Sequence, residues 1–188
     1  MTPRRLLPVL LLLLAACGAA PLRVAVPSVP ADGRIASAFA TVEVLDVGLP
    51  AYAEDDDLYV QEAGGAVTPL GRALWADEPG RAVTLDLARA LGDLTGARVA
   101  PEPWPFEERA EARVDVRLAE AVADRGRGEY VLRGQFFVAS QDGSGRDRAQ
   151  GFRIAVPLPE EAGPAAIAAA RAQATLALAR EIAADGLR

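Results

Sequence analysis

Cys17 is the only cysteine in the chain, and it follows Leu14-Ala15-Ala16 at the end of an apolar stretch that begins at Leu6. Arg4 and Arg5 stand just before that stretch. A basic start, an apolar middle of about 7–15 residues and small residues before a cut are the features of a secretory signal. The stretch is too short to cross a bilayer, which needs about 20 residues. The chemistry expected at Cys17 is therefore that of a thiol at a processing site.

The four residues ending at Cys17 resemble a bacterial lipoprotein box. In such boxes the cysteine thiol receives a diacylglycerol, the chain is cut before the cysteine, and the new amino terminus is acylated. Two or more acyl chains give stable anchoring, at about 0.8 kcal/mol per buried CH₂. Gly18 follows, and no aspartate stands there to mark inner-membrane retention. This predicts a lipid anchor in the outer membrane facing the periplasm; the alternative is an incidental cysteine in an ordinary signal peptide.

Other catalytic chemistry has few residues to use. The chain has no histidine, and its one cysteine is assigned to the lipid. Ser-His-Asp catalysis, Cys-His catalysis and Cys/His zinc sites are therefore excluded. Glu107, Glu108 and Glu111 could still supply a pair of carboxylates for acid–base catalysis. The alternative is that all three are solvated surface charges. We therefore expect that the protein is not an enzyme and that it binds no metal and no other cofactor.

Two further polar segments suggest ligand chemistry. The run Glu54–Asp57 has the charge for calcium but lacks the spacing of an EF-hand loop, so it is interpreted as a solvated acidic loop. The segment 142–147, which reads Asp-Gly-Ser-Gly-Arg-Asp, resembles a metal loop or a phosphate cradle. It opens no helix, which favours a β-turn.

The charge balance excludes one class of partner. Cleavage before Cys17 leaves 172 residues, enough for one domain. Removal of Arg4 and Arg5 leaves 18 basic side chains, all arginine, against 26 acidic ones, a net charge of −8. Nucleic-acid binding depends on basic side chains that neutralise phosphates, so we expect none.

The chain divides into a signal peptide (1–16), a lipidated N-terminus with an Ala/Pro-rich tether (17–40) and one domain (41–188). The tether is predicted to be extended, and Leu22–Val26 allows a short strand. In the domain, Thr41–Leu49 is predicted to be a strand. The residues from Leu58 to Leu70 are predicted to form a hairpin around Gly64-Gly65.

A helix is predicted to begin near Trp75–Pro79 with Asp77 as N-cap, and Gly96 is placed to end it. After a short strand at Arg98–Ala100, three alternating runs predict an antiparallel meander. The runs are 113–121, 130–139 and 152–156. A last helix is predicted from Pro164 to about Ala184. The resulting fold class is α+β, a two-layer sandwich in which an antiparallel or mixed sheet carries two helices on one face.

The order of these landmarks is similar to that of the PqiC-like auxiliary lipoproteins of ABC-type transport systems. Two motifs carry the resemblance beside the lipobox: Leu49-Pro50-Ala51-Tyr52, and Trp75-Ala76-Asp77-Glu78-Pro79 before a helix. Gly80 departs from the family pattern, which more often has a helix-favouring residue there. The resemblance covers roughly residues 42–184.

The resemblance implies an accessory lipoprotein of an MCE-type system that moves phospholipid or other hydrophobic molecules between two membranes. Its partners would be an MCE-domain protein with its inner-membrane permease and ATPase, the outer membrane, and further copies of itself. The alternative is a lipoprotein for outer-membrane assembly or ligand binding.

Three aromatic residues are candidates for partner binding because aromatic side chains often anchor interfaces. They are Tyr52, Trp75 and Trp104. The alternative is that Tyr52 and Trp75 pack on the core or brace a turn, and that Trp104, between Pro103 and Pro105, covers a core edge.

Overall fold

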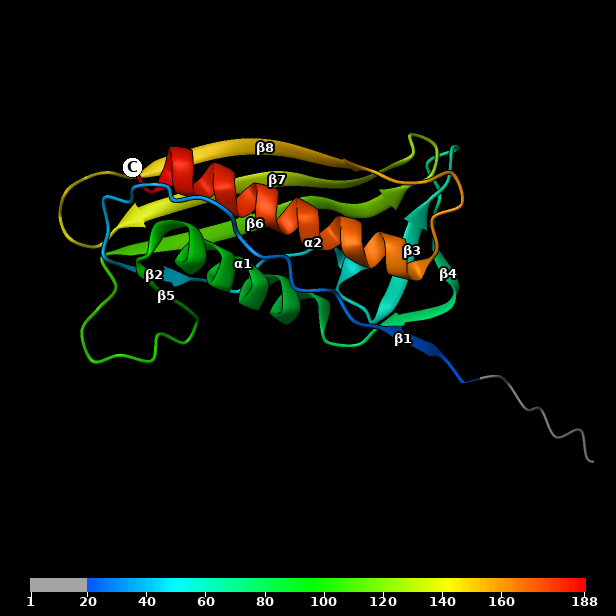
Figure 1. Cartoon of the computed structure of the whole chain (residues 1–188), viewed down its shortest axis with the longest axis horizontal. Helices are drawn as coiled ribbons and strands as arrows, with labels where there is room; N and C mark the ends of the chain where they lie inside the picture. The colour runs from blue at the N-terminus through cyan, green and yellow to red at the C-terminus, as the bar shows by residue number, and fades with distance from the viewer. Residues whose placement is uncertain (1–19) are drawn as a thin grey trace, which may run out of the picture.

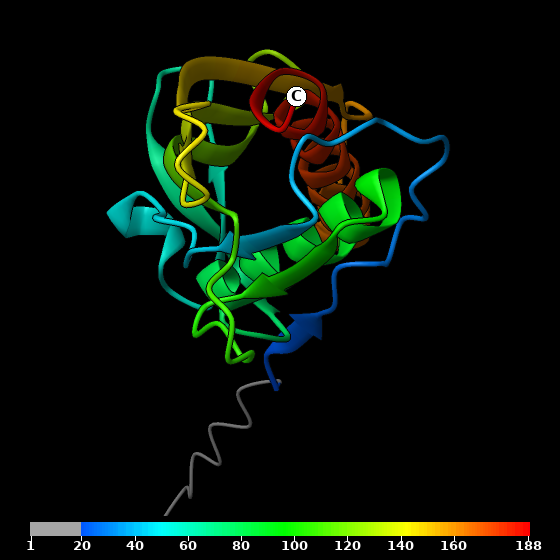
Figure 2. The same ribbon diagram turned by 90° about the vertical axis from the view of Figure 1, so that its left-hand side faces the viewer.

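The computed structural model describes residues 20–188, so the signal peptide and Cys17 lie outside the described residues. It confirms the predicted α+β class: one mixed sheet carries two helices on the same face. Figure 1 shows both helices in front of the sheet. Figure 2, seen from one end, shows the sheet bending into an arc whose open side is covered by the helices. The apolar core lies between these two layers.

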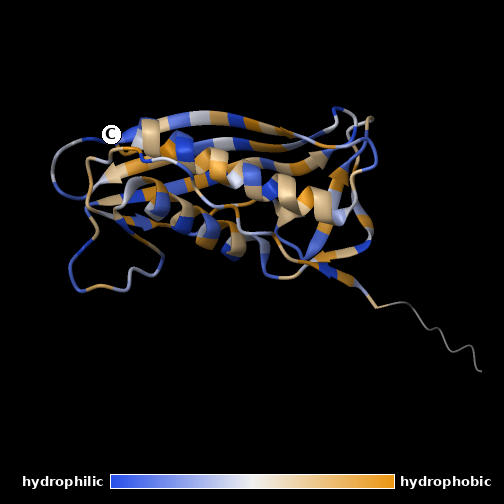
Figure 3. Cartoon of the chain, in the orientation of Figure 1, coloured by the Kyte–Doolittle hydropathy of each residue, from blue (hydrophilic) through white to orange (hydrophobic). Residues whose placement is uncertain are grey.

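The predicted meander is the largest part of the sheet and consists of β6 (Ala112–Asp124), β7 (Glu129–Ser140) and β8 (Arg148–Pro157). All its pairs are antiparallel. Apolar and polar residues alternate along these strands in Figure 3, as expected for a sheet with one buried face. A register shift interrupts the β6–β7 pairing between Leu118 and Glu120. Gly134 lies opposite the shift, where a Cβ atom would come within 2.1 Å of the Arg117 carbonyl oxygen.

Two groups of strands share the other side of β6. At its start, β6 pairs in parallel with β2 (Thr41–Val44), which also pairs in parallel with β5 (Arg98–Pro101). At its end, β6 pairs in parallel with β3 (Asp57–Gln61), which forms the predicted hairpin with β4 (Val67–Trp75). The middle of β6 therefore has a gap on this side, bridged only by Gly48 opposite Arg117.

Helix α1 (Pro79–Thr95) begins slightly later than its predicted cap. Trp75 is the last residue of β4, and the N-cap is Glu78, whose carboxylate accepts hydrogen bonds from the N–H groups of Gly80 and Arg81. Asp77 instead accepts from the N–H of Glu78. The longer glutamate side chain reaches two free N–H groups of the first turn, so the prediction of Asp77 as N-cap was wrong. Gly96 ends the helix at a φ of 73°, as predicted.

Helix α2 (Pro164–Glu181) continues into a short π-helical segment, η2 (Ile182–Gly186). Its packing face is built from alanines and a few larger residues, among them Ile167, Leu178 and Ile182. Small side chains allow α2 to lie close to both α1 and the sheet. At Gly186 the backbone is so close to β7 that an added Cβ atom would lie 2.9 Å from the Val138 side chain and 3.1 Å from that of Phe136.

The Ala/Pro-rich segment before the first long strand lies on the domain. Leu22–Val24 forms β1, which pairs in parallel with the end of β4. Further along, the N–H of Ile35 donates to the carbonyl of Leu94, the N–H of Ala38 donates to that of Leu187, and Phe39 is buried. The sequence placed these residues in a tether; in the structure they contribute one strand and part of the core.

Among the described residues, no helix has the length and apolar character needed to span a bilayer.

Candidate docking surface

Tyr52 fills the gap on the side of β6. It lies in the 3₁₀ turn η1 (Ala51–Ala53), and its phenol oxygen accepts a hydrogen bond of 3.0 Å from the N–H of Ala121. Its ring meets that of Tyr59 edge-on at a centroid distance of 6.2 Å. Burial raises the pKa of the Tyr52 phenol, an effect opposed by the hydrogen bond from Ala121. Tyr52 therefore satisfies a strand N–H that neither β2 nor β3 reaches.

Trp75 is also an internal residue, with 7% of its surface exposed. Its indole ring lies 4.5 Å from the guanidinium carbon of Arg171 on α2. Arg171 is 4% exposed and donates a 2.7 Å hydrogen bond to the carbonyl of Pro79. This cluster connects the end of β4, the start of α1 and the middle of α2. Trp75 thus braces the fold, which was the alternative considered for it.

Burial dominates the electrostatics around Arg171. Desolvation lowers the pKa of its guanidinium, and nearby Tyr130 and Asp86 oppose that effect. The group remains charged because an arginine does not lose its proton in proteins. Desolvation also raises the pKa of Tyr130 to about 12. These groups border a cavity of about 20 Å³, room for a single water molecule, so this part of the interior does not hold a larger ligand.

Trp104 has a different environment. It lies on the segment between β5 and β6, residues 102–111, which we call the Trp104 loop. Its Nε1 donates a 2.6 Å hydrogen bond to the carbonyl of Glu108, and its ring packs edge-on against Phe106 at 4.9 Å. The guanidinium carbon of Arg98 lies over the Phe106 ring, 5.1 Å from its centroid, and Phe106 is still 43% exposed. The loop thus holds two aromatic rings in a defined arrangement at the surface.

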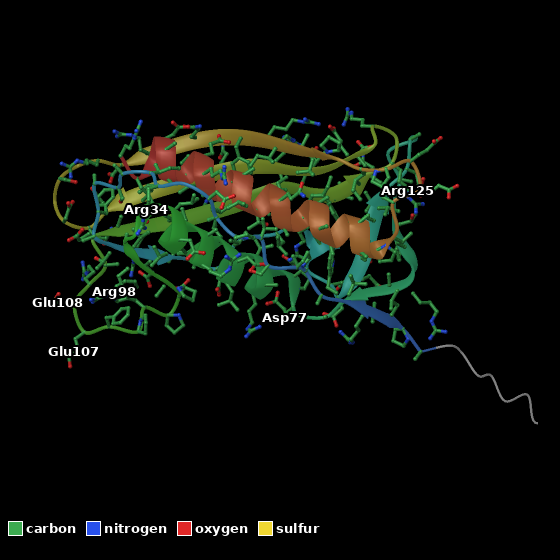
Figure 4. All side chains as sticks on the ribbon, viewed as in Figure 1. Arg34, Asp77, Arg98, Glu107, Glu108 and Arg125 are labelled. Atoms are coloured by element: carbon green, nitrogen blue, oxygen red, sulfur yellow. The ribbon has the colours of Figure 1, made fainter. Side chains whose placement is uncertain are left out.

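The three carboxylates of the loop do not form a catalytic pair. Glu107 and Glu108 point outward from the loop into solvent in Figure 4. Glu111 instead holds the base of the loop: its carboxylate accepts from the N–H of Ala40, and its own N–H donates to the hydroxyl of Thr41. The three residues therefore have solvent-exposed or structural positions.

A groove of about 670 Å³ lies next to the start of the Trp104 loop. The segment from Asp46 to Leu49, the first turns of α1 and the end of β5 line it. Its charged lining residues are Asp46, Glu54, Glu78, Arg81 and Glu102, and its apolar ones include Val47 and Leu85. The sequence did not predict this groove because its walls come from segments that lie far apart along the chain. The only local signal is that each of these segments carries an acidic residue.

The other acidic segments have ordinary surface roles. In the run Glu54–Asp57, Asp56 pairs with Arg23 at 3.1 Å. Asp142 accepts from the N–H of Ser144 and lies 3.8 Å from Arg146, an arrangement typical of a turn. Within residues 20–188, no cluster of three or more acidic, histidine or cysteine side chains is placed to hold a metal ion.

Of the three predicted partner-binding aromatics, the structure places Trp75 in the core, Tyr52 half-buried beside β6, and Trp104 half-buried on an otherwise exposed loop. Trp104, Phe106 and the end of the groove at Pro101 and Glu102 form the docking surface considered below. Phe106 was missed by the sequence analysis, although its place two residues after Trp104 in a proline-rich loop is a usable signal.

Comparison with solved structures supports the fold. A Xanthomonas campestris protein described as a member of the DUF330 family superposes with a TM-score of 0.71 at 17% identity, covering 87% of this chain and 93% of that one. The structure of an uncharacterized protein gives a TM-score of 0.66 at 15% identity, covering 81% and 97%. A PelC dodecamer from Paraburkholderia phytofirmans gives only 0.46 at 13% identity, covering 81% and 95%.

Comparison with curated proteins gave no match. The family model described as "ABC-type transport auxiliary lipoprotein component" matches residues 22–183, which include every strand and both helices. The chain therefore belongs to the family of ABC-type transport auxiliary lipoprotein components.

Proposed function

We propose that this protein is an outer-membrane-anchored accessory lipoprotein of an MCE/ABC-type lipid transport system. The observation that carries the transport role is membership of the auxiliary lipoprotein family over residues 22–183. The leader with Cys17 at its end supports the anchor. This family is a class of transport component and not a class of enzyme, which agrees with the solvent-exposed and structural positions of Glu107, Glu108 and Glu111.

The Trp104 loop and the end of the groove at Pro101 and Glu102 are the docking surface in this proposal, and an MCE-domain protein is the partner. Exposed aromatic rings that are already held in place lose little conformational freedom on binding and are frequent interface anchors. The carboxylates of Asp46 and Glu102 at this end of the groove favour a partner segment that carries arginine or lysine. In Figure 1 the loop lies at the opposite end of the long axis from β1, and therefore far from the anchored end of the chain.

The mechanism is tethering. An anchored docking domain is confined to a thin layer at the membrane, which raises its effective concentration for a partner that reaches the same layer. The protein itself carries out no chemical step in this scheme. It holds the far end of a transport assembly whose energy comes from the ATPase at the inner membrane.

Affinity purification from detergent-solubilised envelopes, followed by mass spectrometry, tests the partner. Recovery of an MCE-domain protein with its permease or ATPase is the expected result. Replacing Trp104 and Phe106 together by alanine should weaken that recovery at least about tenfold, since truncated interface anchors typically cost 2 kcal/mol or more.

The matched control replaces Glu107 and Glu108 by alanine on the same loop, and this variant should retain the partner. Equal losses for both double variants would assign the effect to the loop as a whole. Failure to recover any MCE-domain protein after cross-linking would refute the proposed role.

Cys17→Ser tests the anchor. The variant should be unlipidated and released from membranes while its circular dichroism spectrum stays that of a folded domain. Firm membrane retention of the variant would contradict the anchor. The homo-oligomer implied by the family resemblance stays a prediction, which light scattering on the detergent-solubilised protein can test.

A further inference from the structure

Three large apolar side chains of the described residues are exposed, and two of them come from elements that border one depression. Leu22 on β1 is 59% exposed and Leu85 on α1 is 40% exposed. A depression of about 270 Å³ lies between their elements, and its apolar lining includes Val24 at the end of β1, Val26 after it and Leu85 itself, beside the polar Asp77, Asp86 and Arg171. Figure 1 shows β1 and the first turns of α1 along the same lower edge of the molecule. We call this the β1–α1 surface; its apolar side chains are Leu22 and Val24 on β1, Val26 after it, and Leu85 on α1.

The length of chain before β1 limits how far this surface can be from an anchor at Cys17. Leu22 is five positions after Cys17 in the chain, and a fully extended chain spans at most about 3.6 Å per position. The Cα atom of Leu22 is therefore no more than about 18 Å from that of Cys17.

The tether cannot lengthen without breaking specific bonds. β1 pairs with β4 at three positions, and the carbonyl of Val24 accepts a 2.9 Å hydrogen bond from the N–H of Ala76. The guanidinium of Arg23 donates to the carbonyl of Trp75 at 3.0 Å and pairs with Asp56 at 3.1 Å. The domain thus begins only a few residues after the lipidated position.

The charged side chains that flank the two leucines are paired with one another. These pairs are Arg23 with Asp56, Arg81 with Asp77, and Arg89 with both Asp86 and Asp93. Three arginines against four aspartates leave a net charge of only −1, so these groups present little net field to a lipid headgroup layer and do not prevent contact between the apolar side chains and that layer.

We propose that the leaflet holding the acyl chains of Cys17 covers the β1–α1 surface, with Leu22 and Leu85 at the lipid interface. The occupant is a lipid bilayer, chosen because the short tether ends at this surface and the exposed side chains there are apolar. The inference rests on the proposed lipidation of Cys17. It adds an orientation: one defined side of the domain lies on the membrane.

The test uses the chemistry of the single cysteine. In the lipidated protein the Cys17 thiol carries diacylglycerol, so a second cysteine is the only one available for labelling. An environment-sensitive fluorophore would be attached at Leu22→Cys, Leu85→Cys, Phe106→Cys and Ala155→Cys in the full-length protein. Ala155 is exposed on β8, at the opposite edge of the molecule, and is the matched control. The proteins would be reconstituted in vesicles of phosphatidylethanolamine and phosphatidylglycerol.

Quenching by nitroxide-labelled lipids and by aqueous iodide then reports each position. Positions 22 and 85 should be quenched several-fold more by the lipid quencher than position 155, and less by iodide. In a Cys17→Ser background with the same vesicles, that difference should disappear.

A lipidated, membrane-retained protein whose probes at 22 and 85 respond like the probe at 155 would overturn the inference while leaving the anchor intact. Shielding of both positions from both quenchers would overturn it too, because it would assign the surface to a second protein. If mass spectrometry shows no lipid on Cys17, the proposed anchor is refuted, and the proposed orientation, which depends on it, is refuted as well. Lipid contact at position 106 as well would support a wider membrane face and refute the docking role of the Trp104 loop.

Discussion

The backbone N–H of Ala121 donates a 3.0 Å hydrogen bond to the phenol oxygen of Tyr52, across the gap where β6 has no neighbouring strand. A strand N–H in such a place must find a partner, because an unpaired buried donor loses its hydrogen bond to water. The tyrosine of Leu49-Pro50-Ala51-Tyr52 supplies that partner from a 3₁₀ turn. The motif that resembles the auxiliary lipoproteins is therefore explained by the architecture of a divided sheet.

Tyr52→Phe removes only this acceptor. We expect the free energy of unfolding to fall by about 0.5–1.5 kcal/mol, the net value of one hydrogen bond, because this bond is only partly buried. Urea denaturation followed by circular dichroism measures it. Tyr59→Phe is the matched control, since Tyr59 supplies the other ring of the same edge-on pair. Similar losses in both variants would show that the ring, and not its oxygen, matters.

Gly134→Ala should destabilise the sheet at the register shift of β6. The added Cβ would lie 2.1 Å from the Arg117 carbonyl oxygen and 2.9 Å from the Cα of Leu118, so backbone must move. Overpacking of this kind costs about 1–3 kcal/mol. At Gly151, on the neighbouring strand, the nearest atom would be 3.8 Å away. Thermal unfolding should show a clear loss for Gly134→Ala and little change for Gly151→Ala.

Arg171→Lys tests the buried cluster of Trp75 and Pro79. A lysine keeps the positive charge, but its ammonium group is not planar. It therefore cannot stack on the Trp75 ring and donate a hydrogen bond to the Pro79 carbonyl at the same time. We expect a loss of about 1–2 kcal/mol in unfolding free energy. Arg180, on the exposed side of α2, gives the matched control Arg180→Lys, which should stay near wild type. A fully stable Arg171→Lys protein would mean that charge alone is required.

The buried phenol of Tyr130 should make the folded protein less stable at high pH. Its pKa is raised from 10.0 to about 12 by burial, so the folded protein binds this proton more tightly than the unfolded chain. The corresponding stability is present below about pH 10 and is lost as the pH rises through about 12, a change on the order of 2–3 kcal/mol. Urea denaturation across this range should show the decline, and Tyr130→Phe should flatten it. An unchanged pH profile in the variant would assign the decline to other groups.

The sequence was sufficient to predict the meander and both helices because each depends on a local period. Alternation over residues 113–121 identifies β6, and Gly96 marks the end of α1. The α+β class and the family resemblance followed from the order of these elements, and both were confirmed.

Features that depend on distant segments could not be predicted. The parallel pairing of β2 with β5 and β6 has no local signature, and neither does the cation beneath Trp75, which comes from α2. Trp75 therefore looked as suitable for an interface as Trp104. The groove beside the Trp104 loop needs residues from three segments, so its shape exists only in the folded chain.

The unclosed sheet has one further consequence. β1, β5 and β8 each pair with a strand on one side only, and free strand edges are sites where proteins aggregate. Proline, which has no N–H to donate, stands at or beside an end of each: Pro21 before β1, Pro101 at the end of β5 and Pro157 at the end of β8. Arg148 and Arg153 add exposed charge to the longest edge. A protein crowded on a membrane surface thus carries its own barrier against edge-to-edge polymerisation.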